Sequence, residues 1–210
     1  MSPIENLIQR LSPNGVAFKE LGEIAELVRG NGMPKTDFTE SGIGAIHYGQ
    51  IYTYYGTWTT KTISFVSPET ARKLAKVDPG DVIITNTSEN VEDVGKAVAW
   101  LGDEQIVTGG HATVLKHDQD PKFIAYWLQS PGFQIQKRRH ATGTKVIDVS
   151  AKNLAKIKIP VPPVEVQREI VRVLDAFSAL EAELEAELEA RRRQYAYYRD
   201  KLLTFEETSV

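Results

Sequence analysis

The chain of 210 residues contains no cysteine. Disulfides and zinc–thiolate centres are therefore excluded, and nothing points to secretion. The opening MSPIENLIQR lacks the apolar core of a signal peptide. No apolar run approaches the roughly 20 residues that a membrane-spanning helix needs. We therefore expect a soluble, cytoplasmic protein that does not interact with membranes.

Motifs that carry catalysis are also missing. The sequence has no G-x-x-x-x-G-K-[ST] phosphate loop, no G-x-G-x-x-G motif and no G-x-S-x-G elbow. The four histidines show no metal-ligand spacing; they are His47, His111, His117 and His140. We interpret His111, which follows a Gly-Gly pair, as a structural histidine. We therefore expect no catalytic residue, no metal site and no cofactor.

The net charge of −3 hides a strong separation of charges along the chain. Residues 133–147 contain four lysines and arginines and no acid, whereas residues 181–189 contain five glutamates and no base. The average charge therefore identifies no partner, and the two segments have to be interpreted separately.

Residues 1–159 are expected to form a mixed α+β head. Segments rich in Ile, Val, Thr and Tyr predict strands, at 43–55, 61–66, 82–85, 96–101, 105–107 and 111–116. Ser-Pro or Asp-Pro pairs predict the starts of helices, over 67–76, 120–129 and 130–139. Residues 86–93 are expected to form a polar loop. Prolines at 160–163 mark the boundary to a second domain, 160–210.

The second domain is predicted to be one long helix, because about forty residues follow without Pro or Gly. Such a helix is roughly 60 Å long. Apolar and aromatic residues recur three and four apart, with a slip in the repeat at Leu188. Because a small head cannot cover so long a stripe, we expect a second helix to bind it. The predicted interface residues are Ile170, Val173, Phe177, Leu180, Leu184, Leu188, Tyr195 and Tyr198.

A basic segment near residue 140 is a candidate for binding a phosphate backbone. Three cations end a predicted helix, and the loop Ala141-Thr142-Gly143-Thr144-Lys145 follows. Cations, hydroxyls and glycine suit contact with phosphates. The predicted contacts are Lys137, Arg138, Arg139, Thr142, Thr144 and Lys145. The alternative is that these cations only compensate the dipole at the end of a helix.

Candidates for contacting DNA bases come from two polar segments. Residues 47–58 are dense in Tyr, Gln and Thr, types that can reach base edges, and we select Tyr48, Gln50 and Tyr52. From the polar loop we select Asn86. The alternatives are aromatic side chains packed in a core and a loop that is merely solvated.

Several segments resemble the specificity subunits of type I restriction–modification systems. They lie at 16–25, 46–51, 79–83 and 142–145. The most specific is Ile157-Lys158-Ile159-Pro160-Val161-Pro162-Pro163, which continues to Gln167-Arg168-Glu169-Ile170-Val171. The resemblance covers nearly the whole chain.

This resemblance implies a function. The head would be a target recognition domain that binds half of a split double-stranded DNA sequence. The helix would be the conserved spacer, which docks on its counterpart and on methyltransferase (M) subunits, and through them on the restriction (R) subunit. The specificity subunit itself would carry out no catalysis.

Members of this family usually carry two recognition domains and two spacer helices, whereas this sequence contains one of each. The resemblance thus implies a half-size subunit or half of a longer gene product. Two copies with antiparallel helices, forming a coiled coil, would recognise an inverted repeat. Glutamates at 181–189 and arginines at 191–193 favour such pairing, and they also fit pairing within one helix.

Two other functions remain open at this point. One is a stand-alone DNA-modifying enzyme, a nuclease or methyltransferase, with an unrecognised motif. The other is a coiled-coil adaptor whose head binds protein.

Overall fold

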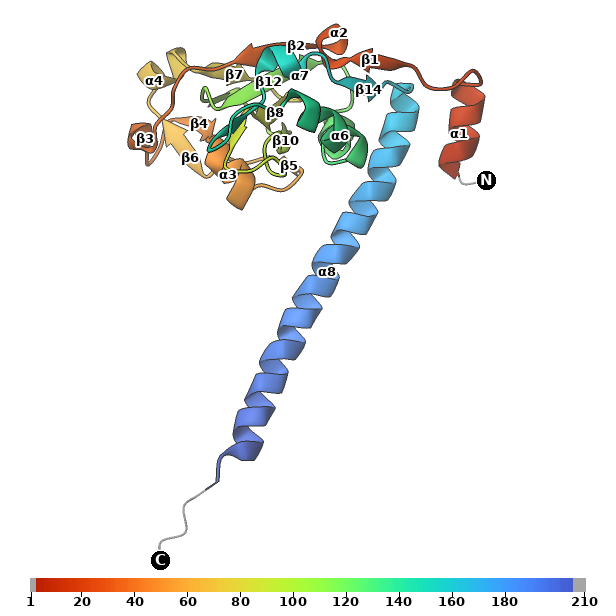
Figure 1. Ribbon diagram of the computed structural model, residues 1–210. Helices are drawn as coiled ribbons and strands as arrows, with labels where there is room; N and C mark the ends of the chain where they lie inside the picture. The colour runs from red at the N-terminus through yellow and green to blue at the C-terminus, as the bar shows by residue number, and fades with distance from the viewer. Residues whose placement is uncertain (1–2, 206–210) are drawn as a thin grey trace, which may run out of the picture. The chain divides into compact units, whose positions relative to one another are not determined.

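The computed structural model describes residues 3–205 (Figure 1). The chain divides into two compact units, Met1–Arg168 and Glu169–Val210. The division falls within the long helix α8 (Val164–Leu203), so the first turn of this helix belongs to the head.

The head contains two five-stranded sheets. In the first, the strand order is β2 (Ala25–Arg29), β12 (Ala112–His117), β8 (Val82–Thr85), β10 (Ala97–Trp100) and β5 (Trp58–Thr59). In the second, it is β3 (Phe38–Thr39), β6 (Ser64–Val66), β4 (Ile43–Ile46), β11 (Ile106–Thr108) and β7 (Ala75–Val77). Within these two sheets, β10 pairs with β5 and β4 with β11 in parallel, and the other neighbouring strands are antiparallel.

Two short antiparallel pairs complete the strands. One is β1 (Phe18–Glu20) with β14 (Lys158–Pro160), and the other is β9 (Thr87–Ser88) with β13 (Ile147–Asp148). The second pair places the start of the predicted polar loop 86–93 beside the segment that follows the basic loop.

Continuous apolar sequences explain the centre of the head. Every residue of β8 and β10 is buried, as expected for strands covered on both faces. One core cluster includes Ile46 of β4, Ile83 of β8 and Val114 of β12. The same hydrophobic core therefore stabilises both sheets and holds the ends of their strands in place.

Short helices connect and cover the strands. They are α1 (Pro3–Leu11), α2 (Leu21–Ile24), the 3-10 turn η1 (Lys35–Asp37), α3 (Tyr48–Thr53), α4 (Pro68–Arg72), α5 (Pro121–Trp127), α6 (Pro131–His140) and α7 (Ala151–Leu154). Ser67, Asp120 and Ser130 cap α4, α5 and α6 through their side chains, with proline at the start of each helix. These starts agree with the sequence-based prediction.

The predicted strand 43–55 is wrong in its second half. β4 ends at Ile46, and α3 follows. The imidazole of His47 accepts a hydrogen bond from the N–H of Gly49, and the Gln50 side chain accepts one from the N–H of His47. This capping box starts a helix in a Tyr- and Thr-rich segment whose composition favours strand. The helix predicted over 67–76 also ends early, at Arg72, because Ala75 begins β7.

The predicted long helix is confirmed: α8 runs without interruption over 40 residues. On its stripe, Phe177, Leu180, Leu184, Leu188, Tyr195 and Tyr198 are each at least half exposed. Ile170 and Val173 are half-buried. Glu187–Arg191 and Glu189–Arg193 form ion pairs within the helix at 3.4 and 2.9 Å. Between residues 3 and 205, no helix is long and apolar enough to cross a membrane.

Candidate nucleic-acid interface

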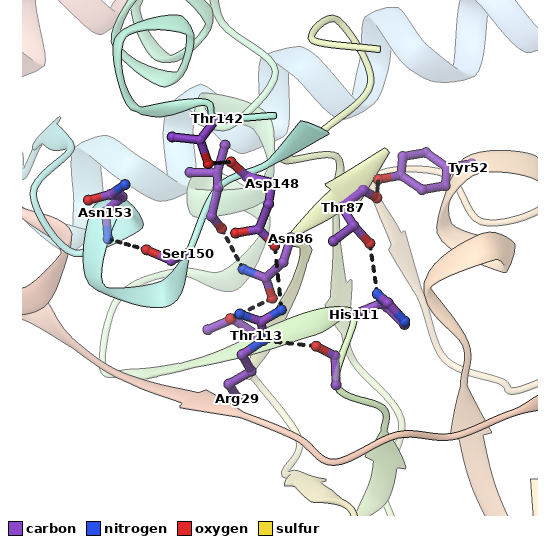
Figure 2. A network of polar contacts seen from close by, with 12 residues as sticks. Arg29, Tyr52, Asn86, Thr87, His111, Thr113, Thr142, Asp148, Ser150 and Asn153 are labelled. Atoms are coloured by element: carbon purple, nitrogen blue, oxygen red, sulfur yellow. Dashed lines mark hydrogen bonds and ion pairs between the residues drawn. The ribbon is translucent and has the colours of Figure 1, made fainter. Parts of the chain in front are cut away.

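A buried side chain, Asn86, joins the segments that carry the candidate contacts. Its Nδ2 donates to the carbonyl of Val149 at 2.7 Å, and its Oδ1 accepts from the hydroxyl of Thr113 at 2.8 Å. Its backbone N–H donates to the carbonyl of His111, and its carbonyl accepts from the N–H of Val149, both at 2.8 Å. Figure 2 shows this network between β8, β12 and the segment after β13.

The predicted role of Asn86 in contacting bases is incompatible with this environment. The residue has no exposed surface, and both ends of its amide are hydrogen-bonded inside the head. Leaving these buried groups unpaired costs about 1–3 kcal/mol each. Asn86 is therefore a structural residue that holds the start of the 87–93 loop.

The basic loop is held in a defined shape by its own backbone. Thr142 and Asp148 exchange two backbone hydrogen bonds, at 2.9 and 2.8 Å, and Arg29 forms an ion pair with Asp148 at 3.5 Å. Gly143 has a φ of +99°, and a Cβ at this position would overlap the carbonyl of Val146. The tight turn itself thus explains this glycine, and close approach to a phosphate is not needed to account for it.

The predicted phosphate contacts separate into exposed and buried residues. Arg139, Thr142, Thr144 and Lys145 are exposed, and within the described part of the chain neither Arg139 nor Lys145 has an ion-pair partner. Arg138 is exposed and pairs with Glu92 at 3.1 Å. We call these five residues, Arg138, Arg139, Thr142, Thr144 and Lys145, the basic surface.

Lys137 does not belong to the basic surface. Its side chain is fully buried, and its Nζ donates to the carbonyl of Glu92 at 2.8 Å and lies 5.7 Å from the ring centroid of Phe133. Burial lowers the pKa of Lys137 to about 8. A Cβ on Gly95 would press on the Lys137 and Phe133 side chains, so glycine is needed beside them. The predicted phosphate contact is therefore wrong for Lys137, which instead links α6 to the 87–93 loop.

A cavity of about 640 Å³ lies between α3 and the 87–93 loop. We call it the α3 cleft. Its lining includes Lys35, Tyr48, Gln50, Tyr52, Thr87, Glu89, Asp93 and His111. Three of the four predicted base contacts, Tyr48, Gln50 and Tyr52, are thus brought together, although on a helix and not on a strand.

The polar ends of two of these three side chains are used internally. Gln50 accepts from the N–H of His47 and donates to the hydroxyl of Ser64. Tyr52 donates to the carbonyl of Thr87 at 2.8 Å, and burial raises its pKa to about 12. Only the Tyr48 hydroxyl has no hydrogen-bond partner within residues 3–205. Tyr48 is therefore the predicted residue best able to bind a ligand in the cleft.

Aromatic rings fix Tyr48 in place. Its ring centroid lies 4.5 Å from that of His47 and 4.7 Å from that of His111. Burial, followed by the charges of Lys35 and His111, lowers the pKa of His47. A neutral imidazole is consistent with its Nδ1 accepting the cap hydrogen bond from Gly49.

His111 is a candidate that the sequence analysis assigned to structure alone. It is exposed in the α3 cleft, with Nδ1 3.0 Å from the hydroxyl of Thr87. Side chains on Gly109 and Gly110 would clash with Met33 and with the carbonyl of Gly30. The Gly-Gly pair lets the chain pass close to Gly30 and Met33 and so sets the position of His111. In the sequence, this pair was the signal that could have identified His111 as a candidate. Within the part of the chain described here, no group of three His, Cys, Asp or Glu residues could hold a metal ion.

Comparisons with known proteins agree on one family. The profile of the type I restriction modification DNA specificity domain matches residues 13–190. The type I restriction enzyme EcoprrI specificity subunit of Escherichia coli is 34% identical over 164 residues, or 67% of this chain. The EcoR124I/EcoR124II specificity subunit of the same organism is 43% identical over 94 residues, or 42% of this chain.

Solved structures show the same fold. A chain from a study of complex assembly and conformational transition of the type I R-M system aligns over 91% of this chain, with a TM-score of 0.63 and 21% identity. The HsdS subunit of Thermoanaerobacter tengcongensis aligns over 88%, with a TM-score of 0.58 and 19% identity.

The head and helix define a DNA specificity fold, and the chain belongs to the family of type I restriction modification DNA specificity domains. The family resemblance identified from the sequence is confirmed. The two curated relatives are named specificity subunits. The matched region spans 22% and 37% of the two curated relatives and 49% and 44% of the two solved chains.

Substituting Lys137 with Met tests the buried cation. Its pKa is about 8 in the folded chain against an ordinary 10.5, so the unfolded chain binds more protons between these pH values. The cost of burying the charge is complete below pH 8 and disappears towards pH 10.5. We expect the unfolding free energy of Lys137→Met, relative to wild type, to be highest near pH 7 and to fall by pH 10. Urea titrations at both pH values measure this difference.

Lys152→Met, at an exposed lysine of α7, is the matched control for losing a surface cation. A stability difference for Lys137→Met that is the same at pH 7 and pH 10 would contradict the buried, destabilised charge.

Proposed function

We propose that this chain is a DNA-recognition subunit of a type I restriction–modification complex. Its head binds one half of a bipartite duplex sequence, and α8 docks on methyltransferase (M) subunits and through them on the restriction (R) subunit. The chain provides specificity and performs no chemistry, and it acts in the cytoplasm with its DNA. The match of the family profile to residues 13–190 carries this proposal.

The basic surface supports contact with the phosphate backbone. Arg139 and Lys145, which have no ion-pair partner within residues 3–205, lie at the end of α6 and in the loop fixed by the Thr142–Asp148 bridge. The exposed hydroxyls of Thr142 and Thr144 lie between them in the sequence. Such groups hold a protein in place on a duplex, without themselves identifying the sequence.

Replacing Arg139 and Lys145 together with Ala tests this contact. Each cation that neutralises a phosphate adds about −0.9 to the slope of log K against log salt, so removing a cation makes the slope less steep. We expect roughly 10- to 100-fold weaker binding to duplex DNA near 0.1 M salt, and a slope that is less steep by about 2. Fluorescence anisotropy across a salt series measures both quantities.

The control variant is Lys61→Ala with Lys73→Ala, which removes two exposed lysines elsewhere on the head. If this control weakens binding as much as the Arg139 and Lys145 variant does, the basic surface has no special role in contacting DNA.

The stripe of α8 supports pairing with a second copy. When two copies of α8 are aligned antiparallel, most apolar and aromatic stripe residues of one copy face stripe residues of the other. The facing layers would be Phe177 with Leu202, Leu180 with Tyr198, Leu184 with Tyr195, and Leu188 with Arg191 of the second copy. This register sets Glu187 of each copy beside the arginines at 191 and 192 of the other, so the charges are complementary.

We therefore propose that two copies pair through antiparallel helices. A two-fold axis between the helices would relate two identical heads, and identical heads would bind the two halves of an inverted repeat. The ion pairs that Glu187 and Glu189 make within the helix are compatible with this arrangement, because surface pairs of this kind are worth only about 0.2–0.5 kcal/mol.

Substituting Leu184 with Asp tests the pairing. The change places a charge at the centre of the stripe in both copies, where its desolvation opposes association. We expect a dimer for wild type at micromolar concentration and a monomer for Leu184→Asp, measured as molar mass by light scattering.

The control Ala186→Asp introduces the same charge on the opposite side of α8 and should leave the dimer intact. Circular dichroism establishes that both variants stay helical. A wild-type monomer at high concentration, or a dimer that survives Leu184→Asp, would contradict the pairing.

A further inference from the structure

The α3 cleft contains polar atoms that form no hydrogen bond within residues 3–205, so they can bind a ligand. The hydroxyl of Tyr48, the Nε2 of His111 and the carboxylate of Glu89 have no hydrogen-bond partner within residues 3–205. Several other lining groups are engaged: Tyr52 donates to the carbonyl of Thr87, and Asn90 donates to the carboxylate of Asp93. The cleft therefore combines a fixed frame with these three groups and the single cation Lys35.

The wall that carries Glu89 is held from two sides. Asn90 and Asp93 close a short turn through two hydrogen bonds, at 2.7 and 2.8 Å. On the other side, Lys137 and Arg138 of α6 bind the carbonyl and the carboxylate of Glu92. Groups held in place before binding lose less conformational entropy on binding, which favours recognition of a specific partner.

The charge of the cleft distinguishes its ligand from that of the basic surface. Glu89 and Asp93 both line it, against a single cation, Lys35, so a phosphate group is disfavoured. A free carboxylate accepts hydrogen bonds, and the exocyclic amino groups of cytosine and adenine donate them in the major groove of duplex DNA. The Tyr48 ring, fixed between two imidazoles, adds an apolar and aromatic contact surface.

We propose that the α3 cleft is the base-recognition site of the head, in which Glu89 accepts a hydrogen bond from the amino group of one adenine or cytosine. Tyr48 and His111 supply the neighbouring contacts through the free hydroxyl and Nε2. This inference rests on the proposed function and deepens it, since it separates the residues that determine specificity from those of the basic surface.

Selection of bound sequences from a pool of random duplexes, with and without the methyltransferase subunit, tests the site. We expect wild type to enrich a motif that contains an adenine or a cytosine whose preference disappears in Glu89→Ala. The discrimination at that position should fall roughly tenfold, at the low end of the range for a good side-chain contact to a base edge. Tyr48→Phe should weaken the base preference at the same position of the motif or at the neighbouring one. The salt slope of both variants should match that of wild type, because no phosphate contact is removed.

Glu104→Ala is the matched control, since it removes an exposed acid that lines a different cavity, beside Trp100. Thermal unfolding establishes that each variant is folded. If Glu89→Ala enriches the wild-type motif unchanged, or changes affinity equally for all sequences, the inference is overturned while the proposed function stands. If wild type enriches no motif, the proposed function fails, and the inference fails with it.

Discussion

The hydrogen bonds of the buried Asn86 amide are the interaction on which the candidate DNA-binding surfaces of the head depend. The 87–93 loop starts from this residue, and the segment that ends the basic loop is bound to it through Val149. The backbone N–H of Asn86 donates to the carbonyl of His111, a residue that lines the α3 cleft. One residue thus fixes the starting points of both surfaces relative to the sheet, and a buried polar group with every partner satisfied specifies one geometry.

A second constraint divides the cationic segment into separate roles. Lys137 is buried against Phe133 and bound to the carbonyl of Glu92, so it stabilises the position of the 87–93 loop. Arg138 pairs with the carboxylate of the same glutamate, whereas Arg139 has no such partner within the described chain. Neighbouring cations on one helix point in different directions, and only those that remain exposed can bind phosphate groups.

The sequence predicted the parts of the fold that depend on local signals. Helix starts at Ser67, Asp120 and Ser130 followed from side-chain caps and prolines, and α8 followed from its length and spacing. Parts that depend on distant partners were not predictable. The partners of the Asn86 side chain lie 27 and 63 residues away, and α3 starts from an unusual histidine cap in a segment with strand-like composition. Tyr48 lines the cleft, but a helix and not the predicted strand carries it there, and its contact with a base stays a prediction.

In the proposed assembly, one chain provides one recognition head, and two copies recognise an inverted repeat. The most direct test is the symmetry of the DNA that the wild-type chain selects from random duplexes. We predict two copies of one short motif, in inverted orientation and at a constant separation, because a stiff helix of about 60 Å sets the distance between the heads. A selected sequence without an inverted copy, or inverted copies at variable separation, would contradict this assembly.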